Sequence, residues 1–211
     1  MIFSLLNGGL HEKSLPPFLL ACAGASSSKV TLDSMTDPRD GQTYKTVKIG
    51  SQTWMAQNLN YEMGNSYCFG DDSTNCAKYG RFYRWDASNT ACPEGWYLPS
   101  KAEWDTLIAA VGGNRTAGAV LKSSSGWADC GDGLDAVSFS ALPAVVRDKD
   151  DVQVLPADVK NDDWGRNIVS NDVTYFWSFT EIDRNRAYRV KLGFGVDYAS
   201  LRDSTAQPSR K

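Results

Sequence analysis

The stretch CPEGWYLPSKAEWDTLIAAV, residues 92–111, decides most of the fold. Ser100 followed by Glu103 forms a capping box, in which the serine oxygen accepts a free helix-start amide and the glutamate reaches back to the serine amide. Apolar residues then recur at the one-face spacing of an amphipathic helix, at Trp104, Leu107, Ile108 and Val111. Gly112 and Gly113 follow, and glycine tolerates the left-handed conformation that ends a helix. The stretch therefore predicts a helix whose two ends and buried face are specified locally.

Composition favours one sizeable folded domain. The chain has 211 residues, 42% of them hydrophobic, with 7 Trp, 9 Tyr and 8 Phe, which is enough to build a core. The net charge is −3 and no run of Lys or Arg occurs, so we expect no nucleic-acid partner. No stretch reaches the roughly 18–20 apolar residues that span a bilayer, so we expect membrane contact only through a lipid anchor.

The histidine content argues against several enzyme classes. His11 is the only histidine, and it lies outside the expected domain. A domain without imidazole can run neither a Ser-His nor a Cys-His nucleophile pair, and it offers zinc no His ligands. We therefore expect no catalytic residues, no cofactor and no enzymatic activity.

The N-terminal residues resemble the leader of an exported lipoprotein. Leu19-Leu20-Ala21-Cys22 has the form of a lipobox, which predicts a signal peptide over residues 1–22 and lipidation of Cys22. Residues 23–36 are Ser-rich at their start and predict a flexible linker. The expected location is the cell envelope, as an outer-membrane lipoprotein or an extracellular protein. The alternative is a coincidental match, because residues 11–13 are charged or polar and Pro16-Pro17 shorten the apolar run.

Four further cysteines suggest two disulfides in an exported domain. Cys68 and Cys76 flank a Gly/Asp/Ser/Asn turn segment that brings its ends together, so we expect them to pair. Metal ligation by these two thiolates is the weaker alternative. Cys92 and Cys130 follow as a second pair only by elimination.

The rest of the chain predicts an α+β fold with short antiparallel strands, one or two helices and long loops. The expected domain spans residues 37–203, followed by a polar tail over 204–211. Expected strands are residues 44–49 and 52–55 around a Gly50-Ser51 turn, 80–85 as a short strand or turn, 139–146, 175–179 and 187–192, with a helical turn over 116–122.

Residues 123–172 form the longest stretch without clear periodicity, and such loops often carry function. Trp127 and Trp164 lie in polar sequence there, and a flat aromatic ring suits a sugar or a protein partner. Neighbouring polar side chains would supply hydrogen bonds at the rim of the site: Asn161, Asp162, Asp163 and Arg166. The alternative is that both tryptophans pack their loops onto the core.

Several long segments occur in an order that is typical of one bacterial family. They are DPRDGQTYKTVKIGSQTWMAQNLNY, CFGDDSTNCAKYGRFYRW, ACPEGWYLPSKAEWDTL, SSSGW, FSALPA and YFWSFTE, which begin at residues 37, 68, 91, 123, 139 and 175. Together they strongly resemble the Fibrobacter succinogenes major paralogous domain, over residues 37–200. The resemblance implies a C-type lectin-like fold and export, often as a lipoprotein, with no assigned biochemical function.

Residues 95–104 also resemble the helix start of formylglycine-generating enzymes, which share that fold. The copper-binding cysteine pair of those enzymes has no counterpart here, so their activity is not expected. Members of the paralogous family usually end in a Val-Arg-Cys strand whose cysteine would bridge to Cys92. This chain has no cysteine after Cys130. The resemblance therefore leaves either a replacement bridge Cys92–Cys130 or an unpaired Cys92.

The Glu-Pro-Asn, Gln-Pro-Asp and Trp-Asn-Asp motifs by which sugar-binding C-type lectins hold calcium do not occur in this sequence. The remaining calcium candidates are acidic residues in two loops, Asp129, Asp132 and Asp135, and Asp148, Asp150 and Asp151. We expect these to be solvated turn acids, with no metal bound. The expected function is a non-catalytic, surface-anchored binding module for a polysaccharide or an envelope protein. The alternative is a structural envelope protein without a small-molecule ligand.

Overall fold

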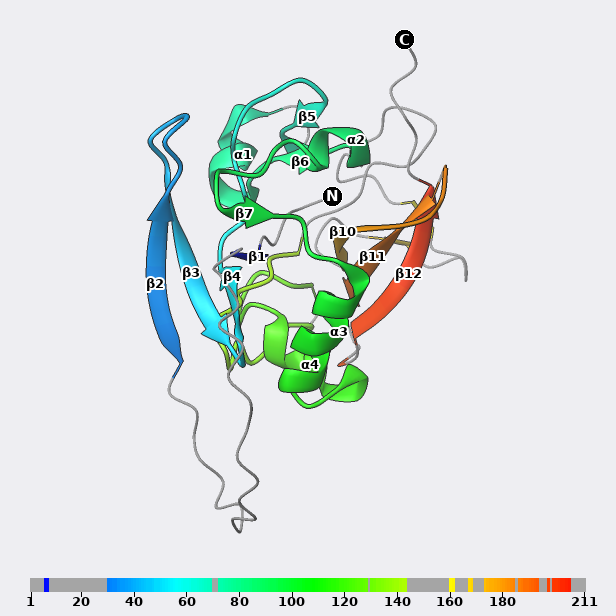
Figure 1. Ribbon diagram of the computed structural model, residues 1–211. Coiled ribbons are helices and arrows are strands. Elements are labelled where there is room, and N and C mark those ends of the chain that lie inside the picture. Colours follow the sequence, from blue (N-terminus) through cyan, green and yellow to red (C-terminus); the bar gives the residue numbers. More distant parts are fainter. Residues whose placement is uncertain are drawn as a thin grey trace.

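In the computed structural model of the chain, the described residues are 6–7, 30–69, 72–128, 130–143, 160–161, 167–168, 173–184, 186–193, 197 and 199–205. Of residues 6–7, 160–161, 167–168 and 202–205, only the backbone is described. The described part is an α+β structure with small antiparallel sheets and short helices (Figure 1). This is the coarse class that the sequence predicted.

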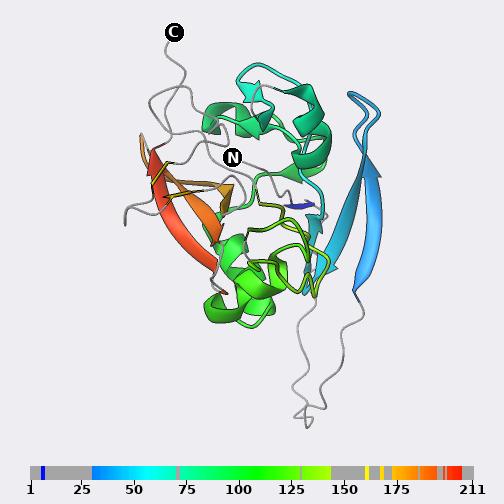
Figure 2. The ribbon, with the colours of Figure 1, turned by 180° about the vertical axis from the view of Figure 1, so that it is seen from behind.

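Two sheets lie on opposite sides of the molecule (Figures 1 and 2). The five-stranded sheet has the order β2 (Thr31–Thr36), β3 (Thr43–Ile49), β4 (Gln52–Met55), β1 (Leu6–Asn7) and β7 (Trp96–Tyr97). The three-stranded sheet contains β10 (Val173–Asp183), β11 (Arg186–Gly193) and β12 (Ala199–Thr205). Two small ribbons pair β5 (Ser66–Tyr67) with β6 (Phe82–Tyr83), and β8 (Lys160–Asn161) with β9 (Asn167–Ile168).

Helices fill the space between the two sheets. Helices α3 (Lys101–Ala110) and α4 (Asn114–Leu121) lie toward one end, and α1 (Ser73–Tyr79) and α2 (Trp85–Ser88) toward the other (Figure 1). Helix α3 has the predicted capping box, and both of its reciprocal hydrogen bonds are present. The predicted apolar face is buried, including Val111 just beyond the helix, and Gly112 and Gly113 follow with φ of 98° and 90°.

An aromatic cluster joins α3 to both sheets. The rings of Trp54 in β4 and Trp104 in α3 lie 4.8 Å apart, and the Trp104 ring lies 5.7 Å from Phe176 in β10. Phe139 packs edge-on against the rings of Trp54 and Phe176. Burial of large aromatics contributes much of the stabilisation in such a core. The core therefore fixes the relative positions of β4, α3 and β10.

The hairpin predicted around Gly50 is confirmed, because β3 and β4 pair antiparallel from Ile49 opposite Gln52. Lys45 and Lys48 face solvent, as the alternation of β3 predicted. The two later strands are also present, and β10 extends beyond the expected bounds to Asp183.

Three segments differ from expectation. Residues 31–36, expected to be linker, form β2, whose pairing with β3 supplies order although its side chains are mostly exposed. Residues 139–143 contain an isolated bridge between Lys122 and Ala141 and no strand. The segment between Cys68 and Cys76, expected to be a loop, contains the first turn of α1, which begins at Ser73.

Candidate binding pocket

A pocket of about 330 Å³ opens where five parts of the chain meet. These are Gln42 just before β3, residues 55–60 at and after the end of β4, residues 76–80 of α1 and its C-cap, residues 139–142, and Phe176 of β10. Met55, Phe139 and Phe176 are buried and supply the large apolar side chains of the lining, here called the apolar floor. The volume lies at the lower end of the range for small-ligand sites, which is about 300–1,000 Å³.

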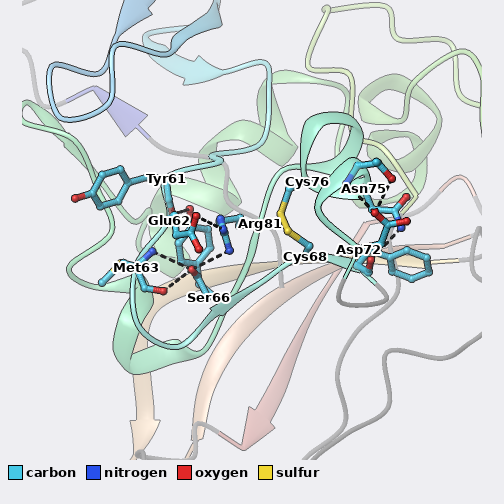
Figure 3. The surroundings of a disulfide bond; sticks show 12 residues. Tyr61, Glu62, Met63, Ser66, Cys68, Asp72, Asn75, Cys76 and Arg81 are labelled. Carbon is cyan, nitrogen blue, oxygen red and sulfur yellow. Dashed lines mark hydrogen bonds and ion pairs between the residues drawn. A yellow bond between two sulfur atoms is a disulfide. The ribbon is translucent and has the colours of Figure 1, made fainter.

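Helix α1 forms one wall, and local interactions hold this short element in place. Asp72 is its N-cap, and its carboxylate accepts hydrogen bonds from the Thr74 amide at 2.9 Å and the Thr74 hydroxyl at 2.7 Å. A disulfide between Cys68 and Cys76 ties the helix to the preceding loop, with the two Cα atoms 4.9 Å apart (Figure 3). A helix of seven residues is not stable alone, so these links maintain the wall.

The C-terminal end of α1 contacts the segment that follows β4. The side-chain amide of Asn58 donates a hydrogen bond to the Tyr79 carbonyl oxygen at 2.9 Å. Gly80 has φ of 69°, and a Cβ atom there would lie 2.7 Å from the Cβ of Asn58. Only glycine fits both this backbone conformation and this approach. The segment after β4 and the end of α1, which both line the pocket, are therefore in direct contact.

Carboxamide side chains dominate the polar lining. They are Gln42, Gln57, Asn58 and Asn60. Gln42 and Gln57 are exposed at the rim, whereas the Asn60 side-chain oxygen is buried and has no hydrogen-bond partner among the described residues. A carboxamide carries both donors and acceptors, so this lining can hydrogen-bond hydroxyl or amide groups of a ligand in either sense.

The charged and ionisable groups of the pocket are few. Lys78 is exposed on α1, and its ammonium lies 4.7 Å from the centre of the neighbouring Tyr79 ring. Ser140 donates its amide and hydroxyl hydrogens to the Asp135 carboxylate at 2.8 and 2.7 Å, which fixes the 139–142 wall. Among the residues that line the pocket in the described structure, none is Asp, Glu or His. This lining suits binding better than acid–base chemistry.

Comparison with known protein families identifies the group to which this chain belongs. The family model of the Fibrobacter succinogenes major domain matches residues 47–207. The chain belongs to the Fibrobacter succinogenes major domain family. Searches of curated proteins and of solved structures found no match. The family assignment was predicted from the sequence segments.

In this member of the Fibrobacter succinogenes major domain family, most pocket residues fall inside the matched region; Gln42 precedes it. Sequence reasoning missed the pocket. One signal was present: three carboxamides, Gln57, Asn58 and Asn60, occur within residues 57–60, directly after the buried end of β4. Several carboxamides directly after a buried strand indicate a polar surface whose backbone is held in place by the core.

Trp127 does not form an exposed platform. It is 6% exposed, and its indole N–H donates to the Ser123 hydroxyl at 3.1 Å and to the Ala141 carbonyl at 3.3 Å. The expectation that Trp127 offers its ring to a ligand is corrected, because the ring packs the loop onto the core. The alternative, that Trp127 packs its loop onto the core, is what the structure shows.

Lys122 supports the same loop from inside. Its ammonium is buried and donates to the Gly131 carbonyl at 2.7 Å, and it lies 5.2 Å from the Trp127 ring centre. Burial lowers the pKa of Lys122. No pattern in the sequence indicated that this lysine would point inward.

The side chains of the other expected ligand-binding residues are not described by the structure. Trp164, Asp162, Asp163 and Arg166 lie outside the described residues, and Asn161 is described only as backbone in β8. These four side chains and that of Asn161 stay predictions.

The calcium candidates have other roles where they are described. The Asp132 carboxylate accepts the Trp127 amide hydrogen at 2.9 Å, and Asp135 holds Ser140. Asp129, Asp148, Asp150 and Asp151 lie outside the described residues. Within the described ranges, no group of three or more His, Cys, Asp or Glu side chains could hold a metal.

The four cysteines that the structure describes form one disulfide and leave two free thiols. The predicted Cys68–Cys76 disulfide is present. The second pairing, Cys92 with Cys130, is not: both are free, Cys130 being exposed and Cys92 half-buried. Burial raises the pKa of Cys92 to about 11. Cys22, the expected lipidation site, lies outside the described residues, and no described helix is long and apolar enough to span a membrane.

Proposed function

We propose that this protein is a non-catalytic binding module of C-type lectin-like fold, anchored in the cell envelope, and that the amide-lined pocket binds a polysaccharide. The observation that carries the proposal is the lining itself. Four carboxamides and three buried apolar side chains line a space suited to one or two sugar units. Sugar hydroxyls are both donors and acceptors, which matches carboxamides.

The floor supports the same ligand class. One face of a sugar ring is largely C–H, and such a face packs favourably on apolar and aromatic side chains. Met55, Phe139 and Phe176 supply that surface beneath the polar rim. Lys78 adds a cation at the rim, which would favour sugars that carry a carboxylate.

A non-catalytic role fits the lining as well. Hydrolysis of a glycosidic bond usually needs two carboxyl groups placed on either side of it. The described lining residues include none. The proposed envelope location rests on the lipobox at residues 19–22 and on the disulfide, since disulfides persist in oxidising compartments.

Isothermal titration calorimetry with cello-, xylo- and galacturono-oligosaccharides tests the proposal. We expect saturable binding of at least one of them. Gln57→Ala and Lys78→Met should each weaken that binding roughly fivefold, as expected for one lost hydrogen bond of about 1 kcal/mol. Lys48→Met is the matched control, because Lys48 is an exposed lysine on β3 that does not line the pocket.

Two results would count against the proposal. If no oligosaccharide binds the folded protein, a structural role in the envelope without a small-molecule ligand is favoured instead. If Lys48→Met weakens binding as much as Lys78→Met, the ligand is held elsewhere by general charge attraction.

A further inference from the structure

The two faces of the three-stranded sheet differ in the side chains that they carry. One face packs against α3 and α4, and Phe176 and Val190 belong to the core on that side (Figure 1). Successive side chains of a strand point to opposite faces, so the residues next to these two point away from the helices. The second face therefore carries Tyr175 of β10 and Arg189 and Lys191 of β11, and all three are half-buried.

These three side chains come together on the second face. Lys191 lies directly opposite Tyr175 in the β10–β11 ladder, and Arg189 lies opposite Trp177, at the next position on the same face. The guanidinium carbon of Arg189 lies 4.1 Å from the centre of the Tyr175 ring, and the Lys191 ammonium lies 5.8 Å from the same centre. Two cations thus lie within about 6 Å of one ring, the range over which a ring attracts a cation. We call Tyr175, Arg189 and Lys191 the cationic cluster.

The neighbouring strand adds a further positive residue. In the β11–β12 ladder, Arg202 lies directly opposite Arg189. Like charges directly opposite each other destabilise an antiparallel pair. No carboxylate among the described residues forms an ion pair with Lys191, and Glu181 lies toward the hairpin end of the sheet, opposite Ala187. Stability alone does not favour such a concentration of positive charge, whereas a bound anion would offset the repulsion.

We propose that the cationic cluster is a second binding site, separate from the amide-lined pocket, and that it holds uronic-acid units of an acidic polysaccharide. Arginine and lysine bind carboxylates through charge-assisted hydrogen bonds, and a guanidinium can hold both oxygens of one carboxylate. The Tyr175 ring supplies an aromatic surface for the C–H face of the sugar, and its hydroxyl can donate or accept a hydrogen bond. An acidic peptide would pair with the cations but has no flat C–H face to pack on the ring.

The position of the cluster separates it from the pocket. Phe176, the next residue along β10, lines the pocket and points to the opposite face of the sheet from Tyr175. The two sites therefore share a strand but no side chain, and each can be altered without changing the other.

Binding of polygalacturonate to the folded full chain tests this proposal. The measurement is made in Lys78→Met, which removes the cation at the rim of the pocket, so that the binding that remains reports on the cationic cluster. We expect saturable binding that weakens at least tenfold when NaCl is raised from about 50 to about 500 mM, because salt screens exposed charges. Fully methyl-esterified polygalacturonate keeps the sugar and loses the negative charge, so it should bind at least tenfold more weakly.

Variants of the cluster identify the contacts. In the same background, Lys191→Met and Arg189→Gln should each weaken the binding of polygalacturonate roughly fivefold or more. Lys48→Met is the matched control, because Lys48 is an exposed lysine on β3 of the other sheet, and it should leave the affinity within twofold. Thermal melting shows which variants fold, and the esterified polymer tests the proposal without any change to the cluster.

Three results would overturn the proposal. The first is no binding of polygalacturonate to Lys78→Met, or equal binding of the esterified polymer. The second is an equal effect of Lys191→Met and Lys48→Met on the affinity. The third is that polyglutamate binds as tightly as polygalacturonate, which would indicate a site for acidic peptides. None of these results decides the role of the pocket, which is tested with oligosaccharides on a chain that retains Arg189 and Lys191.

Discussion

Single residues explain why the pocket, and not the loop around Trp127, is the candidate site. Trp127 lies in a polar loop and has a large ring, yet its indole N–H donates hydrogen bonds to Ser123 and Ala141 inside the protein. Asn60 shows the opposite pattern, since its side-chain oxygen is buried without a partner among the described residues. Buried polar atoms are normally paired, so an unpaired one beside a pocket indicates where a ligand or a water would be accommodated.

At this scale, Trp127→Phe separates structure from binding. The substitution keeps an aromatic ring and removes the two indole hydrogen bonds, so the free energy of unfolding should fall by roughly 1–2 kcal/mol. Oligosaccharide affinity, measured on the folded variant at 15 °C, should stay within twofold of the original. A large loss of affinity with an unchanged denaturation curve would restore Trp127 as a ligand contact.

The half-buried thiol of Cys92 predicts an alkaline loss of stability. Its pKa is raised from the ordinary 9.0 to about 11 by burial, so the folded protein retains the proton while the unfolded chain loses it. The stabilisation is complete below pH 9 and is lost as the pH rises through 11. Burial also raises the pKa of Tyr83, so the comparison must be made between variants.

Urea denaturation of the original protein and of Cys92→Ala at pH 8 and pH 11 measures this contribution. From pH 8 to pH 11, the free energy of unfolding of the original protein should fall by roughly 2 kcal/mol more than that of Cys92→Ala. Cys130→Ala alters an exposed thiol, so its free energy of unfolding should change with pH as that of the original protein does. If the free energies of unfolding of Cys92→Ala and the original protein change equally with pH, ionisation of Cys92 does not destabilise the folded protein.

At the scale of elements, α1 connects the disulfide to the pocket. Its residues from Cys76 onward line one wall, whereas its start depends on the Asp72 cap and on the bridge to Cys68. Arg81, just after the helix, forms an ion pair with Glu62 at 2.8 Å (Figure 3). The bridge is thus placed where it can affect binding as well as stability.

Removal of the bridge by Cys68→Ser together with Cys76→Ser tests this connection. A closed loop of this length contributes about 2–3 kcal/mol by the chain-entropy model, so stability to urea should fall by that amount. Oligosaccharide affinity should fall by at least tenfold even under conditions where the domain remains folded. Unchanged affinity in the folded double variant would show that α1 keeps its position without the bridge.

For the whole molecule, the sequence predicted what is determined locally and missed what is assembled from distant segments. The capping box, the buried face of α3 and the Gly112-Gly113 end all lie within residues 100–113, so the helix could be predicted in detail. The pocket draws on residues between 42 and 176 that meet only in the folded chain. The strands β1 and β2 depend on pairing partners distant in the sequence, and the mostly exposed side chains of β2 show no buried alternation that would have marked it in advance.

Mapping of ligand contacts by NMR tests the central claim most directly. In ¹⁵N-labelled protein, titration with the best-binding oligosaccharide should shift the side-chain amide signals of Gln57, Asn58 and Asn60 and the backbone signals of residues 76–80 and 139–142. The Trp127 indole signal and the β2 amides should not move. Shifts centred on the Trp127 loop, or none at any saturating oligosaccharide concentration, would contradict the assignment of the amide-lined pocket as the binding site.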